Sequence, residues 1–332
     1  MKIGVAGLGR IGPFHAATLA GLGHDVVVTD HRAEHAGQTA AEHGYAVAAD
    51  VPALLAEVDA VVIATDTGSH PALLREAVAA RLPTFCEKPV AVTLAETIAL
   101  RRLMAELPSA VPVQVGFQRR FDDGYRRAKE AVASGELGFV HSIRATTHDQ
   151  SPPAPGYLPT SGGIFRDCNI HDFDIIRFVT GREVVSVYAV GANKGEPFFS
   201  EAGDVDTGAA LLTLDDGTLV TVTSTRYNGA GHDVRMELLG SQAAIGVGYD
   251  DSLALTSAES GATYPSGPRL ATFLDRFAPA YRAEMAAFCE VASGSQPSPC
   301  SVAEALAAFR IADAAQRSLE SGLPVAVAEV TG

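Results

Sequence analysis

The sequence predicts an α/β protein in which a doubly wound parallel sheet is followed by an α+β region with a large, mostly antiparallel sheet. Through the first third of the chain, apolar strands alternate with helical patterns, which is typical of a parallel sheet covered by helices. Beyond residue 180, strand patterns follow one another directly, with Asp215-Asp216-Gly217 as a hairpin turn. We therefore expect one domain over residues 1–118 and a second over residues 119–332.

Composition excludes several classes of protein. The chain has 332 residues, enough for two cores, and its formal net charge of -14 offers no basic surface for nucleic acid or an anionic membrane. The four cysteines, Cys86, Cys168, Cys289 and Cys300, have no CxxC spacing and no zinc pattern. The opening MKIGVAGLG lacks the pattern of a signal peptide, and no apolar run reaches the length of a membrane span. We expect a soluble cytoplasmic protein with no metal, membrane or nucleic-acid partner.

The first predicted strand, residues 2–6, runs into a glycine-rich turn, Gly7-Leu8-Gly9-Arg10-Ile11-Gly12, and then into a helical pattern over residues 14–22. This is GxGxxG in the context of strand, turn and helix that a dinucleotide site requires. The first glycine permits the tight turn, the second lets a pyrophosphate approach the backbone, and the third allows close packing of helix and strand. The residues of this turn expected to contact the dinucleotide are Gly7, Gly9, Arg10, Ile11 and Gly12.

The second predicted strand, residues 26–28, ends near Asp30, which stands 18 residues after Gly12. That spacing suits a carboxylate that binds the adenosine ribose hydroxyls of a dinucleotide. Asp30 favours NAD because a carboxylate repels the 2′-phosphate of NADP. Arg32, two residues further on, leaves NADP possible, and we expect both residues to lie at the cofactor.

Polar loops follow two further strands. The strand over residues 60–64 leads into Thr65-Asp66-Thr67-Gly68-Ser69-His70, and the strand over residues 84–86 leads into Glu87-Lys88-Pro89. Ligands bind at the carboxyl ends of such strands. Pro89 keeps Lys88 extended, although a lysine at a strand end is most commonly only solvated. The loop residues expected to contact the dinucleotide are Thr65, Thr67, His70, Glu87 and Lys88.

The remaining elements complete two sheets. We expect helices over residues 71–80, 93–105 and 121–134, strands over residues 113–116, 139–147, 184–190, 207–214, 219–225 and 234–239, and two closing helices. The strand over residues 207–214 is apolar on both faces. One helix layer can cover one face, so we expect a second subunit to cover the other.

The stretch over residues 162–174, GGIFRDCNIHDFD, combines apolar residues at helical intervals with charges. In one α-helix, Asp167, His171 and Asp174 stand at i, i+4 and i+7 and project from one face. A carboxylate one turn from an imidazole fixes its tautomer and tunes it as a general acid or base. The alternative is a buried hydrogen bond that only satisfies two polar groups of the core.

Together these motifs resemble the Gfo/Idh/MocA oxidoreductase family, and within it the inositol 2-dehydrogenases. The resemblance runs nearly from end to end and rests on GxGxxG, Asp30, the loop over residues 65–70, Glu87-Lys88-Pro89, GFQRRFD over residues 116–122, GGIFRDCNIHDFD, FLDRF over residues 273–277 and IADAA over residues 311–315. It implies an N-terminal Rossmann domain that binds a dinucleotide. It also implies a C-terminal domain that binds substrate and forms a homodimer or homotetramer through its sheet.

The resemblance also implies a catalytic set of Lys88, Asp167 and His171. By this resemblance, we expect His171 to take the proton from a substrate hydroxyl as its carbon gives a hydride to nicotinamide, Asp167 to stabilise the imidazolium, and Lys88 to orient the reacting oxygen. Further polar groups hold the other hydroxyls of a cyclitol or pyranose. The residues expected to contact substrate are Arg119, Arg120, His148, Asp149, Asp167, His171, Asp174 and His232.

The sequence departs from the inositol pattern at one place. At the place where the inositol dehydrogenase pattern has Tyr-Gly-Tyr-Asp, this chain has Ala230-Gly231-His232-Asp233. The loss of the two phenols favours another cyclitol or a pyranose over myo-inositol as substrate. Two alternatives stay open: an NADP(H)-linked sugar ketoreductase, which Arg32 allows, and a non-catalytic dinucleotide-binding regulator on the same scaffold. A metal-dependent dehydrogenase is disfavoured, since no further ligand stands at metal-site spacing.

Overall fold

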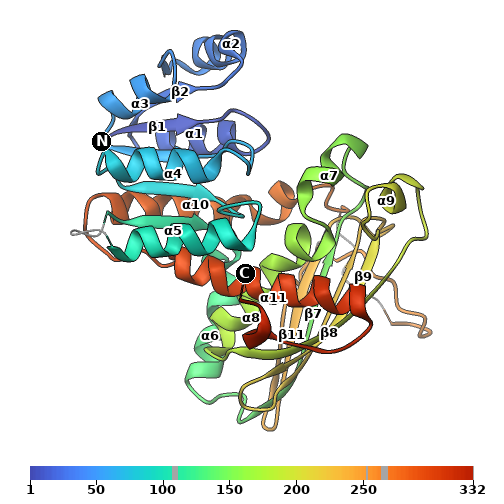
Figure 1. The fold of residues 1–332 in the computed structure, drawn as a ribbon. Coiled ribbons are helices and arrows are strands. Elements are labelled where there is room, and N and C mark those ends of the chain that lie inside the picture. The colour runs from blue at the N-terminus through green and yellow to red at the C-terminus, as the bar shows by residue number, and fades with distance from the viewer. Residues whose placement is uncertain (107–110, 252, 263–267, 332) are drawn as a thin grey trace. The chain divides into compact units, whose positions relative to one another are not determined.

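The computed structural model describes residues 1–106, 111–251, 253–262 and 268–331 (Figure 1). Its internal contacts divide the chain into two compact units. The first unit comprises residues 1–118 and 279–306, and the second comprises residues 119–278 and 307–331. The predicted boundary at residue 118 does not account for residues 279–306, which pack with the first unit. The assignment of cofactor binding to residues 1–118 and of substrate binding to residues 119–332 stays a prediction.

The first unit contains a parallel sheet with the strand order β3-β2-β1-β4-β5-β6. Its strands are β1 (Lys2–Ala6), β2 (Asp25–Thr29), β3 (Ala46–Val47), β4 (Ala60–Ile63), β5 (Thr84–Glu87) and β6 (Val113–Gly116). The helices between them are α1 (Gly12–Gly21), α2 (Ala33–His43), α3 (Val51–Glu57), α4 (His70–Ala79) and α5 (Leu94–Glu106). The strand order reverses between β1 and β4, which is the point where doubly wound sheets bind ligands. The predicted parallel sheet is confirmed.

Successive residues of these strands enter different cores. Val5 packs in one core with α1, α2 and Phe288 of α10 (Phe273–Ala292). Its neighbour Ala6 packs in another core with Leu54 of α3. The period of two along each strand therefore places helices on both faces of the sheet. Phe288 explains why residues 279–306 join this unit, because that part of α10 buries its apolar side in the first core.

The second unit contains a sheet with the strand order β12-β11-β7-β10-β9-β8-β13, in which β7 and β10 run parallel and all other neighbours run antiparallel. Its strands are β7 (Val140–His148), β8 (Val184–Ala192), β9 (Thr207–Leu214), β10 (Leu219–Thr225), β11 (Asp233–Gly240), β12 (Ala244–Val247) and β13 (Val325–Ala326). Its helical segments are η1 (Gln118–Phe121), α6 (Asp123–Ala133), η2 (Pro155–Tyr157), α7 (Leu158–Ser161), η3 (Phe165–Asn169), α8 (Ile170–Thr180), α9 (Phe198–Glu201) and η4 (Val327–Glu329), together with parts of α10 and of α11 (Val302–Ser321). The predicted mostly antiparallel sheet is confirmed.

One face of this second sheet is buried and the other is open in the single chain. Along β9, Ala210 and Leu212 are buried, whereas Leu211 between them is 45% exposed. Tyr188 of β8 pairs with Leu211 in the register and is also exposed, as is Leu219 of β10. The open face therefore carries large exposed apolar side chains on β8, β9 and β10.

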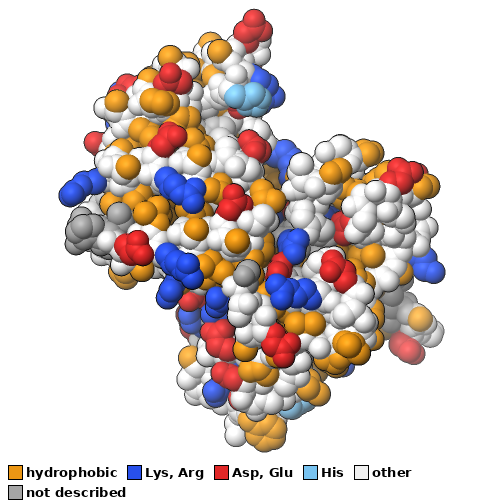
Figure 2. All heavy atoms as spheres, viewed as in Figure 1, with side chains coloured by type: hydrophobic (Ala, Val, Ile, Leu, Met, Phe, Trp, Pro, Cys, Tyr) orange, Lys and Arg blue, Asp and Glu red, His pale blue; other side chains and the backbone are white. Residues whose placement is uncertain are grey.

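Charged side chains of both signs are scattered over the face of the molecule seen in Figure 2, with no continuous basic patch in view. Within the described ranges, no helix combines the length and the apolar character needed to cross a membrane.

Candidate functional site

The glycine-rich turn between β1 and α1 has the geometry of a dinucleotide cradle. Gly7 has a φ of 94°, and a Cβ there would lie 2.7 Å from a backbone oxygen just beyond β4. A Cβ on Gly12 would lie 2.0 Å from the carbonyl oxygen of Gly7, so both positions need glycine. Around Gly9, a Cβ would meet nothing within 4 Å, which leaves the approach to the start of α1 open. Arg10 is exposed, and Ile11 precedes α1 as its N-cap.

Asp30 lies just beyond the end of β2 and is tied to this turn. Its Oδ2 accepts a hydrogen bond from the Leu8 amide at 2.8 Å, and its Oδ1 accepts hydrogen bonds from the amide and Nε of Arg32 at 2.9 and 3.0 Å. Burial opposes ionisation of Asp30, but the hydrogen bonds from Arg32 and Leu8 outweigh it and hold the pKa of the carboxyl well below its usual range. An ionised carboxylate at this position fits ribose hydroxyls and disfavours a 2′-phosphate.

His70 joins the two polar loops of the first sheet. It is buried, with Nδ1 2.8 Å from the carbonyl oxygen of Pro89 and Nε2 3.3 Å from that of Thr65. Burial lowers the pKa of His70. Thr65 and Thr67 are half-buried and remain candidates for cofactor contact, whereas His70 braces the loops from within.

Lys88 follows a carboxylate that is fixed on two sides. Oε1 of Glu87, the last residue of β5, lies 2.7 Å from Nε2 of His15 on α1. Oε2 of Glu87 accepts the amide hydrogen of Lys88 at 3.3 Å. A Cβ on Gly116 of β6 would lie 2.9 Å from Oε2 of Glu87, so glycine leaves room for that carboxylate. The bond between Lys88 and Pro89 is cis.

The stretch predicted as one α-helix is composite. Gly162 and Gly163 have positive φ angles of 82° and 88°, and they precede the π-helical turn η3, which leads into α8. A π-helical turn changes the spacing of side chains around the axis and is frequent at functional sites. The prediction of a single α-helix through this stretch is therefore wrong at residues 165–169. Asp167 belongs to η3, and His171 and Asp174 belong to α8.

Three predicted substrate ligands have partners inside the protein. Arg120 and Asp174 form a two-pronged ion pair, with Nε 2.8 Å from Oδ2 and Nη2 2.6 Å from Oδ1, and both side chains are buried. Arg119 lies 2.6 Å from Asp172 and donates to Thr147 at 2.9 Å, also in the interior. These contacts hold η1 against α8 and β7. We therefore omit Arg119, Arg120 and Asp174 from the substrate set proposed below.

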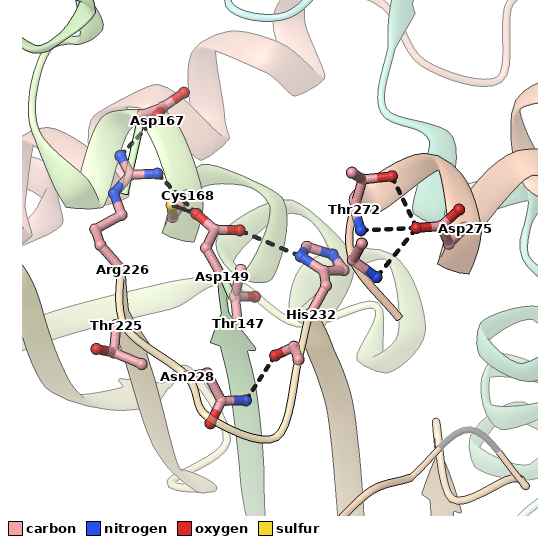
Figure 3. A network of polar contacts seen from close by, with 12 residues as sticks. Thr147, Asp149, Asp167, Cys168, Thr225, Arg226, Asn228, His232, Thr272 and Asp275 are labelled. Atoms are coloured by element: carbon pink, nitrogen blue, oxygen red, sulfur yellow. Dashed lines mark hydrogen bonds and ion pairs between the residues drawn. The ribbon is translucent and has the colours of Figure 1, made fainter. Parts of the chain in front are cut away.

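A row of polar residues crosses the end of the second sheet. Asp149 follows β7, Arg226 follows β10 and His232 precedes β11, and the pairing of β7 with both neighbours places these three in register. The amide of Asp149 donates to the carbonyl oxygen of Thr225 at 2.9 Å. Oδ1 of Asp149 lies 3.2 Å from Nδ1 of His232, and its Oδ2 lies 2.9 Å from Nη1 of Arg226 (Figure 3).

Arg226 extends this row to the π-helical turn. Its Nη2 lies 2.7 Å from Oδ2 of Asp167, whose Oδ1 accepts a hydrogen bond from the Tyr157 hydroxyl at 2.9 Å (Figure 3 shows the Arg226 contacts). Burial opposes ionisation of Asp149, but the hydrogen bond from His232 and the charge of Arg226 outweigh it and lower the pKa of Asp149 to about 2. The arrangement keeps an array of charged donors and acceptors at fixed positions.

The two remaining histidines of the predicted set lie in the same unit. His148 ends β7, with Nε2 3.2 Å from the Thr223 hydroxyl, and burial lowers its pKa, which favours the neutral ring. His171 is half-buried near the start of α8. Of the three predicted catalytic residues, Asp167 and His171 belong to the second unit and Lys88 to the first.

Sequence reasoning missed Arg226 and Tyr157. Arg226 is the first charged residue after the strand Leu219–Thr225, and polar residues at strand ends are a signal for a site. Tyr157 stands in the proline-rich stretch before the glycine pair, where no spacing connects it to Asp167. Within the described part of the chain, no group of three or more His, Cys, Asp or Glu side chains is arranged to hold a metal ion.

Two family models match this chain. Residues 1–117 match the model described as an oxidoreductase family with an NAD-binding Rossmann fold, and residues 125–246 match the model of the GFO/IDH/MocA C-terminal domain.

Named relatives match over nearly the full length. The chain is 40% identical to the myo-inositol dehydrogenase Hyg17 of Streptomyces leeuwenhoekii, over 98% of this chain and 100% of the relative. It is 34% identical to the scyllo-inositol 2-dehydrogenase (NAD(+)) of Bacillus subtilis, over 98% of this chain and 96% of the relative. Among solved structures, the scyllo-inositol dehydrogenase of Lactobacillus casei with bound NAD(H) and scyllo-inositol is similar, with a TM-score of 0.88, 30% identity and 99% of both chains covered.

Proposed function

Because this chain belongs to the Gfo/Idh/MocA family of oxidoreductases, we propose that it is an NAD-dependent cyclitol dehydrogenase. It moves a hydride between nicotinamide and the carbon of one secondary hydroxyl. The observation that carries this proposal is the row of Asp149, Arg226 and His232 joined to Asp167, because fixed donors and acceptors in alternation suit a ring that bears several hydroxyls. The full-length similarity to inositol dehydrogenases supports the same substrate class.

The first unit holds the cofactor in this proposal. NAD supplies the hydride acceptor when it is bound. The open side of Gly9 admits the pyrophosphate to the start of α1, where Arg10 and Ile11 follow in the turn. Asp30 accepts hydrogen bonds from the adenosine ribose, and Thr65 and Thr67 lie in the next loop along the sheet. Glu87 orients the Lys88 backbone through the hydrogen bond that it accepts from the Lys88 amide.

Three side chains carry the proton chemistry. His171 takes the proton of the substrate hydroxyl that is oxidised, and the Asp167 carboxylate stabilises the imidazolium that forms. Tyr157 and Arg226 each donate to one oxygen of Asp167 and so fix its orientation. Lys88 donates a hydrogen bond to the reacting oxygen and offsets its developing negative charge.

The substrate set contains His148, Asp149, Asp167, His171 and His232. His232 occupies the position at which the inositol dehydrogenase pattern has a tyrosine. We therefore propose a cyclitol other than myo-inositol, or a pyranose, as the preferred substrate. Because Nδ1 of His232 faces Asp149, its imidazole would form hydrogen bonds to a substrate hydroxyl in a different direction from the phenol of a tyrosine.

We also propose a cytoplasmic location and a homodimer or homotetramer formed through the second sheet. The exposed Tyr188, Val190, Leu211 and Leu219 support the assembly, because they are large apolar side chains on three adjacent strands. A second copy of the chain with the same face would bury them.

The test is a substrate panel with NAD and, separately, NADP, followed by the absorbance of the reduced cofactor. We expect NAD reduction with one inositol stereoisomer or pyranose, and its loss in Lys88→Ala and His171→Ala. Preference for NADP and for keto-sugars in the reducing direction would favour the ketoreductase. Tight NAD binding without turnover in either direction would favour a non-catalytic regulator.

A further inference from the structure

Arg226 bridges two carboxylates that come from different elements. Its side chain is 4% exposed, with Nη1 on Asp149 after β7 and Nη2 on Asp167 in η3. Its amide donates to the carbonyl oxygen of Asp206 at 2.8 Å, so the backbone is fixed as well. A buried guanidinium with both ends occupied transmits a displacement of one carboxylate to the other, because its planar fork is rigid.

The two carboxylates belong to different tasks in the proposed reaction. Asp167 also accepts a hydrogen bond from the Tyr157 hydroxyl, and in the proposed reaction it stabilises the His171 imidazolium. Asp149 also faces His232 and accepts a long hydrogen bond from the Cys168 thiol at 3.6 Å. His232 contacts Asp149, and Arg226 connects Asp149 to Asp167, so in the proposed reaction a hydroxyl bound at His232 would be linked to Asp167 through Arg226.

We propose that Arg226 is a positioning residue that couples hydroxyl recognition at Asp149 and His232 to proton transfer at Asp167. This inference rests on the proposed function for its kinetic consequence. Lysine cannot replace Arg226 in this role, since a single ammonium is a point charge that does not span both carboxylates with fixed geometry. A correctly placed hydroxyl thus improves the reaction rate as well as the binding of the substrate.

The kinetic test uses one substitution at each end of the bridge. Tyr157→Phe removes a donor to Asp167, and His232→Gln changes the partner of Asp149. With Arg226 present, we expect His232→Gln to raise KM and also to lower kcat, and the kcat effects of the two substitutions to deviate from simple multiplication by about threefold or more. In the Arg226→Lys background, itself about 10- to 100-fold slower in kcat, His232→Gln should change KM alone. Independent multiplication of the effects in both backgrounds would overturn the proposal.

A matched control separates coupling from a structural role. Arg127 on α6 pairs with Glu136 at 2.7 Å in the same unit but is exposed, so Arg127→Lys should leave kcat, KM and the melting temperature unchanged. If Arg226 only stabilised the fold, Arg226→Lys would lower the melting temperature and the active fraction while KM and the multiplicative behaviour stayed as in the wild type. That result also contradicts the proposal.

A second measurement needs neither cofactor nor turnover. The melting temperatures of Asp149→Asn, Asp167→Asn and the double variant should be non-additive with Arg226 present, and additive when Arg226 is replaced by Met. Additive shifts with Arg226 present would overturn the coupling. If no substrate is turned over while the shifts are non-additive, the bridge stands and the proposed function fails, so the two failures are distinguishable.

Discussion

Nε2 of His15 lies 2.7 Å from Oε1 of Glu87 in the interior of the first unit. The His15 side chain is fully buried, and that of Glu87 is 12% exposed. This contact joins α1, which starts at the glycine turn, to the residue that precedes Lys88. The proposed cofactor cradle and the proposed reacting lysine are thus fixed to each other within one unit.

Replacing His15 should weaken both the fold and cofactor binding. His15→Ala leaves Glu87 without this partner and creates a cavity, so we expect a loss of about 2–4 kcal/mol in the free energy of unfolding. Since the Lys88 backbone then loses its support, NADH affinity should fall about tenfold. The chain has no tryptophan, so NADH fluorescence reports binding directly, and circular dichroism follows unfolding. His15→Gln, which keeps a side-chain donor, should recover most of both; equal loss in the two variants would contradict this account.

Asp30 should set the choice between NAD and NADP. If Asp30 accepts the ribose hydroxyls of NAD as proposed, Asp30→Ala removes that acceptor, and NAD affinity should fall roughly 10- to 100-fold. Arg32 is now held by Asp30, and its release should let it bind the 2′-phosphate of NADP. Titration of both cofactors measures the change. The gain in NADP affinity should disappear in Asp30→Ala combined with Arg32→Ala; a gain that persists there would exclude Arg32 as its source.

Asp149 should contribute stability that acid removes. Its pKa is lowered from 3.8 to about 2 in the folded protein, so the folded state favours the ionised form. The contribution, about 2 kcal/mol, is fully present above about pH 4 and is lost as the pH falls towards 2. Asp149→Asn should therefore be less stable than the wild type near neutral pH, and the difference should shrink below pH 4. Unfolding by urea at several pH values measures this, and a difference that stays constant down to pH 2.5 would contradict it.

The sequence was sufficient for the features that depend on neighbouring residues. The glycine turn, the position of Asp30 and the alternation of strands and helices all follow from local spacing, and the structure has them where they were expected. The return of residues 279–306 was not predictable in this way. Phe288 joins the first core across more than 160 residues of chain, and no local pattern encodes that contact.

The candidate site shows the same limit. Asp167, His171 and Asp174 have α-helical spacing, but a π-helical turn and the buried Arg120 give them different surroundings. The row of Asp149, Arg226 and His232 depends on the register of three strands, which a single sequence does not specify. Residue types were therefore predictable, and their partners were not.

The open face of the second sheet should hold the subunits together. Leu211→Asp places a charge in the middle of the apolar face, so we expect the assembled form to dissociate into smaller species. Leu22, in the first unit, has nearly the same exposure, 44% against 45%, and Leu22→Asp is the matched control. Light scattering coupled to size-exclusion chromatography gives the mass. Equal masses for the wild type and Leu211→Asp would argue against assembly through this face.

Replacing Gly9 by Ala should weaken cofactor binding, whereas replacing Gly12 by Ala should weaken the fold. A Cβ on Gly9 meets nothing within 4 Å, so Gly9→Ala should fold with wild-type stability. Because the added methyl would occupy the proposed path of the pyrophosphate, NADH affinity should fall by at least about tenfold.

A Cβ on Gly12 would lie 2.0 Å from the carbonyl oxygen of Gly7. Because this clash is with the backbone, no change of side-chain conformation can remove it. Gly12→Ala must therefore shift the turn against α1, and we expect a loss of about 2 kcal/mol or more in the free energy of unfolding. Thermal unfolding and NADH titration of both variants check the pair. Since the methyl group of Gly9→Ala contacts no protein atom within 4 Å, it can act only by blocking a bound ligand. A stable Gly9→Ala protein that binds NADH as tightly as the wild type would therefore show that the dinucleotide binds elsewhere.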